Sequence, residues 1–165
     1  MDKRKKTVIL FSVLALVAAL IFPLIRYKSI TSPVQETSYD PALECKSSAL
    51  LWNLDSIDNS TGFIIPGWIY LQGYEPKKIR YSVWLKEKGS SRCLILTTET
   101  MEREDVAKSA TDGLDHTLSG FCAAVSLRNL DLDTRDYEII IQYACDDRNY
   151  LVPTGIFLRD QLLKG

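Results

Sequence analysis

Beyond residue 48, apolar residues recur at every second position in short runs, which is the periodicity of a strand with one buried face. The alternation is clearest in IRYSVWLK, where Ile79, Tyr81, Val83 and Leu85 share one face. The run DYEIIIQYA is almost continuously apolar, as expected for a central strand that is covered on both sides. Branched and aromatic runs bounded by turn formers predict strands over Leu50–Ile57, Phe63–Gln72, Lys78–Lys86, Arg92–Thr98, Ser119–Leu127, Asp136–Ala144 and Tyr150–Leu158.

Seven short strands in about 115 residues predict one all-β domain over residues 49–160, followed by a C-terminal tail, residues 161–165. The expected fold is an immunoglobulin-like antiparallel β-sandwich of about seven strands. Asp133 and Thr134 precede Tyr137 at a strand start, which is the arrangement of a tyrosine corner. An ordinary aromatic residue at a strand edge is the alternative interpretation of Tyr137.

A different pattern opens the chain, because Thr7 to Ile25 is a run of 19 residues without a charge. A helix of this length spans roughly 28 Å, close to the ~30 Å hydrocarbon core of a bilayer. Four basic residues precede the run and two follow it, so residues 1–6 are expected to be a cytoplasmic tail. A cleaved signal peptide is the alternative, although its apolar core is usually shorter. The pattern predicts a single-pass cell-membrane protein, anchored through Thr7–Ile25, with an extracellular C-terminal domain.

The segment between the apolar run and the strands, residues 26–48, is mostly polar and contains Pro33 and Pro41. Such a composition predicts a stalk that holds the domain away from the bilayer. Residues 1–28 hold six of the 20 basic residues and one of the 21 acidic residues, so the rest of the chain carries a net charge of −6. An acidic domain is a poor partner for nucleic acid, which requires a basic surface, whereas basic partners remain compatible.

The polar stretch MEREDVAKSATDGLDHTLSGF, from Met101 to Phe121, interrupts the alternating runs. A long loop inside a compact domain is functional or is held by its own residues. Arg103 can present a planar fork to carboxylates, Asp105 can accept backbone N–H groups, and Val106 can plug the core edge. Ser119, Gly120 and Phe121 then restart the sheet, with Gly120 allowing a close backbone approach.

The same stretch resembles a β-sandwich domain of bacterial cell-surface and surface-polysaccharide proteins, over about residues 60–158. In that group an R-x-D-V segment is followed by S-G-F and then by L-x-x-x-x-Y-x-I. The matching residues are Arg103, Asp105, Val106, Ser119, Gly120, Phe121, Leu132, Tyr137 and Ile139, with Ile65, Gly67 and Trp68 upstream. Asp136 stands where the group has a glycine. The resemblance implies an accessory, non-catalytic module.

Four cysteines, all beyond the apolar run, fit two disulfides in an exported domain. If the strands on either side of the long loop form a hairpin, Cys93 falls near Cys122, and Cys45 and Cys145 are the remaining pair. The single histidine and the absence of any C-x2-C spacing argue against a zinc site, so no metal or other cofactor is expected. Turn aspartates in DLDTRD and CDDRN leave calcium as an open alternative.

Catalytic patterns are weak, and no catalytic residue is assigned. Asp115, His116 and Ser119 contain the residue types of a triad, but residues so close on one loop seldom reach triad geometry. The T-L-x-T-C pattern of sortase transpeptidases is absent.

The preferred hypothesis is therefore a non-catalytic, membrane-anchored interaction module that binds surface glycan or an envelope partner. Its candidate binding residues are Trp52, Trp68, Tyr70, Tyr74 and Tyr150, since an exposed ring can stack on a sugar. The alternatives are a structural spacer or subunit of an envelope complex and, third, a small surface enzyme.

Overall fold

The computed structural model describes residues 34–163, apart from residues 46 and 61. The predicted cytoplasmic tail, the predicted membrane segment Thr7–Ile25 and the first part of the predicted stalk lie outside the described residues. Within the described part of the chain, no helix has the length and apolar character needed to cross a bilayer.

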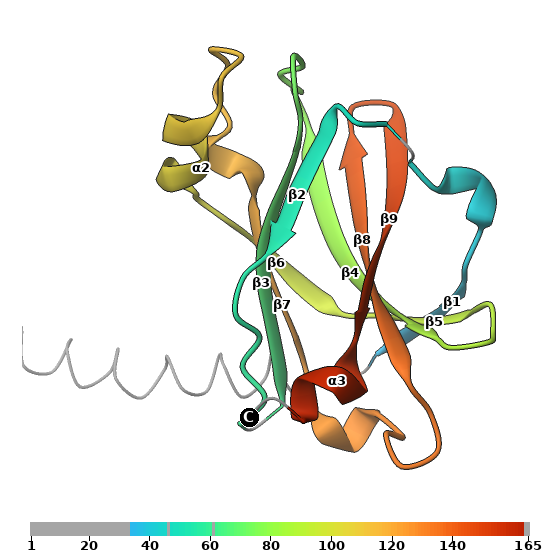
Figure 1. Ribbon diagram of the computed structural model, residues 1–165. Helices are drawn as coiled ribbons and strands as arrows, with labels where there is room; N and C mark the ends of the chain where they lie inside the picture. The colour runs from blue at the N-terminus through green and yellow to red at the C-terminus, as the bar shows by residue number, and fades with distance from the viewer. Residues whose placement is uncertain (1–33, 46, 61, 164–165) are drawn as a thin grey trace, which may run out of the picture.

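The described residues form two antiparallel sheets, and the prediction of an all-β domain is confirmed (Figure 1). One sheet has the order β1-β5-β4-β8-β9, with bounds Gln35–Ser38, Arg92–Ile95, Ile79–Glu87, Tyr137–Cys145 and Arg148–Phe157. The other has the order β2-β3-β7-β6, with bounds Leu50–Leu54, Phe63–Leu71, Gly120–Val125 and Thr97–Met101.

The main core lies between the sheets and is filled by the alternating residues of both. On β4, Tyr81, Val83 and Leu85 point inward and are at most 6% exposed. On β3 and β7, Ile65 and Phe121 face them from the other sheet and are fully buried. The period-two pattern of the sequence therefore places one face of each strand in the core.

The chain changes sheets within the run that predicts a single strand over Arg92–Thr98. Leu96 separates β5 from β6, and its backbone N–H donates to the Val83 carbonyl at 2.9 Å. The polar stretch after β6 contains a short helix α2, Glu104–Ser109, and a turn of 3-10 helix η2, Thr117–Ser119. A further 3-10 turn, η3, Leu127–Asn129, lies between β7 and β8, and the described chain ends in the short helix α3, Leu158–Leu162.

The second half of the predicted stalk is part of the domain, so the stalk prediction is wrong for this portion. Gln35–Ser38 pair with β5 as strand β1, and Pro41–Leu43 form the 3-10 turn η1. Tyr39, between them, packs on the outer face of the five-stranded sheet against Trp84 and Ile140. These apolar side chains on the outer face need a cover, and the preceding segment supplies it.

The predicted disulfides are not present among the described cysteines. Cys93 points away from the core on β5, beside Tyr39 and Trp84, whereas Cys122 points away from the core on β7 in the other sheet. The two thiols therefore lie on opposite outer faces, and a disulfide needs its Cα atoms within roughly 7 Å. The hairpin that would join Cys93 to Cys122 does not form, because β6 lies between β5 and β7 in the chain and pairs with β7. Cys45 and Cys145 are not joined either.

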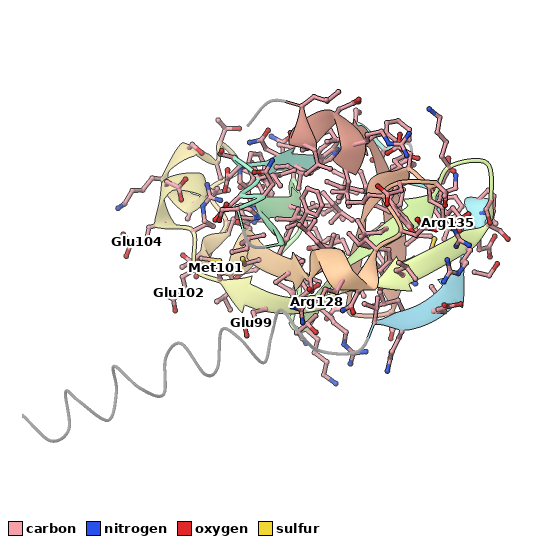
Figure 2. All side chains as sticks on the ribbon, turned by 90° about the horizontal axis from the view of Figure 1, so that it is seen from below. Glu99, Met101, Glu102, Glu104, Arg128 and Arg135 are labelled. Carbon is pink, nitrogen blue, oxygen red and sulfur yellow. The ribbon has the colours of Figure 1, made fainter. Side chains whose placement is uncertain are left out.

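Strand β6 is an edge of the four-stranded sheet. Glu99, Met101 and Glu102 project from this edge, and Glu104 follows at the start of α2 (Figure 2). Met101 is 44% exposed. Charged side chains along an edge oppose pairing with a second strand, so this edge is protected.

Candidate functional site

A pocket opens between the two sheets at the end where β3 turns into β4, which is the top of Figure 1. We call it the end pocket, and its volume is about 120 Å³. Strands contribute Tyr70, Ile79, Tyr81 and Tyr143; the β3–β4 connection contributes Glu75 and Pro76; and the segment around η2 contributes Asp115, His116, Leu118 and Ser119. Because an engineered apolar cavity of roughly 150 Å³ accepts benzene, a pocket of this size fits one side-chain-sized group.

Ser119 carries the clearest sign of an unfilled site in the end pocket. The residue is 2% exposed, and its hydroxyl has no hydrogen-bond partner among the described residues. A buried hydroxyl without a partner costs about 1–3 kcal/mol of stability, so native proteins rarely keep one without a reason. Because Ser119 is one of the residues that line the end pocket, a ligand group held there could supply the missing partner.

His116 joins the η2 segment to β3. Its ring is 4% exposed and stacks on Tyr70 at 4.1 Å between centroids, and Tyr70 in turn stacks on Trp68 at 5.7 Å. The His116 Nε2 atom lies 2.9 Å from a carboxylate oxygen of Asp112, which also accepts from the Gly73 N–H at 2.8 Å. The Gly73 N–H and then the His116 ring lower the pKa of Asp112 to about 2. These contacts hold one wall of the end pocket in place.

Arg103 holds the other end of the same segment. Its Nε and one terminal nitrogen donate to the two oxygens of Asp105 at 2.8 and 2.7 Å, and Nη1 donates to Asp55 on the β2 side at 2.7 Å. The Arg103 guanidinium lowers the pKa of Asp105 to about 2. Val106, on α2, is 4% exposed.

Gly120 and Phe121 continue from the η2 segment into β7. A Cβ atom at Gly120 would lie 2.5 Å from the Cγ of Arg103 and 2.7 Å from the Met101 carbonyl oxygen. Only glycine therefore lets the Arg103 stem cross the strand here. Phe121 is fully buried in the main core. Tyr137, at the start of β8, is 1% exposed and belongs to the same core.

The five candidate aromatic residues do not form an exposed platform. Tyr70 is 8% exposed, and Trp52, Trp68, Tyr74 and Tyr150 are half-buried. Of these five, Tyr70 lines the end pocket. Stacking on a sugar ring requires an open aromatic face, so this arrangement suits a small group held among rings better than a sugar laid across them.

The geometry of a serine triad is not present among the described residues. Asp115 accepts from the Thr117 N–H at 2.9 Å, and the carboxylate that His116 contacts is that of Asp112. The Ser119 hydroxyl, which would be the nucleophile, makes no hydrogen bond to His116. A nucleophile activated by a general base needs that hydrogen bond.

Within the described residues, no group of three or more histidine, cysteine, aspartate or glutamate side chains is placed to hold a metal ion. The turn aspartates that suggest calcium accept hydrogen bonds from the protein itself. Asp131 accepts from the Thr134 hydroxyl at 2.6 Å, and Asp146 accepts from the Lys78 N–H at 3.0 Å.

A second hollow at the opposite end of the sheets is lined by charged groups that already have partners. Arg135 donates to Glu87 at 3.1 Å, and Arg159 donates to the carbonyl oxygens of Leu132 and Arg135 at 2.7 and 3.0 Å. These charged groups already make hydrogen bonds within the protein, whereas the end pocket contains the unpartnered Ser119 hydroxyl.

Comparison of the chain with protein-family models, with curated proteins and with solved structures gives no match. The resemblance to surface-polysaccharide proteins therefore stays a prediction.

Several pocket residues are not among the candidates that the sequence suggests. Tyr81 and Tyr143 face each other across β4 and β8, and their rings stack at 5.7 Å. Both occupy inward positions of alternating strands, so the sequence places them in the core but does not reveal that they meet. Glu75, which lines the pocket, and Asp112, which contacts the lining residue His116, lie in loops, where the sequence pattern has no period from which to predict contacts.

Proposed function

We propose that this protein is a non-catalytic, membrane-anchored interaction module whose end pocket receives one group of an envelope partner. The observation that carries the proposal is the unpartnered Ser119 hydroxyl in a pocket walled by tyrosine rings. A pocket with apolar walls and a few convergent polar groups is typical of a binding site.

The proposal includes an immunoglobulin-like fold, which the strand order supports. The four-stranded sheet runs β2-β3-β7-β6, and the five-stranded sheet contains β5-β4-β8-β9. These orders correspond to the A-B-E-D and C′-C-F-G arrangements of immunoglobulin-like domains. Tyr137 opens β8, the strand on which a tyrosine corner is expected.

The end pocket is suited to face outward from a membrane. Strand β1, where the described chain begins, lies in the lower half of Figure 1, and the β3–β4 connection lies at the top. A chain that leaves the bilayer ahead of β1 would therefore present the end pocket to partners outside the cell.

Photo-crosslinking of the full-length protein in its native envelope tests the proposal. A photoreactive amino acid at Leu118, which lines the end pocket and is 53% exposed, is expected to form an adduct with a partner. The matched control is the same amino acid at Leu127, which is 38% exposed in the turn between β7 and β8.

An adduct from position 118 that is absent from position 127 supports binding at the end pocket. Equal adducts from both positions, or no adduct from position 118, would contradict it. In either case the spacer hypothesis would be preferred, since a spacer needs no pocket.

A further inference from the structure

We propose that the group received by the end pocket is a primary ammonium ion, presented by the partner as a lysine side chain or as an amine on an envelope glycan. The inference rests on the proposed function and names the chemistry of its ligand. Three features of the end pocket point to it: its charge, its walls and its unpartnered hydroxyl.

The charge of the end pocket is negative. Glu75 and Asp115 both line it, and no lysine or arginine does. The hydrogen bond from Thr117 lowers the pKa of Asp115, so this carboxylate is ionised at neutral pH. His116 is offset by Asp112 in the same pair, so it adds no net positive charge even when it is protonated. An anionic ligand would face two carboxylates, whereas a cation would be attracted.

The walls are suited to a cation stripped of part of its water. Tyr70, Tyr81 and Tyr143 contribute aromatic rings to the lining. The Tyr81 hydroxyl donates to the Leu118 carbonyl at 2.6 Å, and the Tyr81 ring stacks on that of Tyr143, so this wall is fixed by contacts within the protein. These uncharged rings exclude water from the wall, so the attraction between a cation and the two carboxylates is screened less than in bulk water.

The unpartnered Ser119 hydroxyl adds a third acceptor to the two carboxylates. An ammonium ion is a compact charge with three N–H donors that can point in separate directions. Glu75, Asp115 and Ser119 come from separate positions in two loops, which matches that demand better than the planar fork of a guanidinium. With about 120 Å³, the end pocket fits the end of one lysine side chain.

The experiment measures dissociation constants for the full-length protein in nanodiscs by ligand-observed NMR. The probes are Nα-acetyl-lysine methylamide, its norleucine counterpart, which lacks the ammonium group, and the pair glucosamine and N-acetylglucosamine. The lysine probe is expected to bind about tenfold more tightly than the norleucine probe, because it adds the ionic contacts to Glu75 and Asp115. A preference for glucosamine over N-acetylglucosamine, without binding of the lysine probe, would also support the inference and assign the ammonium to a glycan.

Two charge-neutralising substitutions test the site itself. Combining Glu75→Gln with Asp115→Asn is expected to weaken the cationic probe about tenfold and leave the neutral probe unchanged. Asn at position 115 can still accept the hydrogen bond from Thr117, so the loop keeps its turn. The matched control is Glu104→Gln, an exposed carboxylate on α2 that pairs with Lys108 away from the end pocket.

Equal affinity for the cationic and neutral probes, or no effect of the double substitution, would overturn the inference. Binding of a neutral probe would then leave the proposed function standing. If no probe binds and position 118 yields no adduct, the proposed function fails as well.

Discussion

Ser119 is the residue at which folding and binding make opposite demands. Its buried hydroxyl lacks a partner within the described residues, so it lowers stability, and it also supplies an acceptor and donor to the end pocket. Two neighbours support its position: its own N–H donates to the His116 carbonyl at 3.0 Å, and Gly120 begins β7. The backbone at this site is therefore determined without the hydroxyl.

Ser119→Ala is expected to raise the free energy of unfolding by about 1 kcal/mol, because it removes an unsatisfied buried polar group. The same substitution is expected to weaken binding at the end pocket. Urea unfolding of the full-length chain, followed by tryptophan fluorescence, measures the first effect. The control is Ser126→Ala. The Ser126 hydroxyl accepts from the Arg128 N–H, so its loss should lower the free energy of unfolding. A Ser119→Ala protein less stable than wild type would show that the hydroxyl has a structural role.

At the scale of elements, the segment between β6 and β7 is held in place by a few polar contacts. Arg103 joins its start to Asp55, and Asp112 joins its middle to the β3–β4 connection. A segment with little apolar burial of its own depends on such contacts for its shape.

Replacing Arg103 by lysine is expected to lower the free energy of unfolding by about 1–2 kcal/mol, because an ammonium cannot reproduce the bidentate fork to Asp105 together with the bond to Asp55. Chemical denaturation measures the change. Lys108→Ala removes an exposed pair with Glu104 and should change stability by less than about 0.5 kcal/mol. A similar effect of both substitutions would argue that Arg103 does not hold the segment.

Asp112 predicts a dependence of stability on pH. Its pKa is about 2 in the folded protein and roughly 3.9 in an unfolded chain, so the folded state favours the ionised form. Its contribution to stability is therefore fully present above about pH 4 and is lost as the pH falls towards 2. The free energy of unfolding, measured from unfolding curves at pH 5, 4, 3 and 2, should fall less steeply with decreasing pH in Asp112→Asn than in the wild type. The control is Glu99→Gln, on the exposed edge of β6, in which the free energy of unfolding should depend on pH as it does in the wild type.

At the scale of the whole molecule, the two-sheet arrangement decides the state of the cysteines. Cys93 and Cys122 lie on the outer faces of different sheets, with the main core between them. Burial raises the pKa of the Cys93 thiol to about 11, which makes it a poor nucleophile at neutral pH.

Thiol titration of the full-length chain, isolated without reductant and then denatured, is expected to find four thiols in each chain. In the native protein, iodoacetamide is expected to label Cys45, which is half-buried, before Cys93, which is fully buried. Peptide mass spectrometry would identify the labelled sites. A disulfide between Cys93 and Cys122 would contradict the sheet assignment.

The alternating pattern of the sequence determined the strands and the residues that face the core, because the period of two depends on local backbone geometry alone. It therefore predicts that Tyr81, Val83 and Leu85 point inward, and they do. The split at Leu96 between β5 and β6 has no such signal, since the alternation passes through a bend between sheets unchanged. Arg103 and Gly120 are recognisable as candidates from their residue types, because an arginine fork suits carboxylates and glycine allows a close backbone approach.

The tertiary structure alone decided which residues meet. Tyr81 reaches Tyr143 through the pairing of β4 with β8, and His116 reaches Asp112 and Tyr70 through the folding of a polar segment across β3. Tyr39 covers the outer face of the five-stranded sheet although its surroundings in the sequence resemble a stalk. Contacts of this kind depend on sheet order and loop path, which arise from the packing of the whole chain and leave no periodic trace in the sequence.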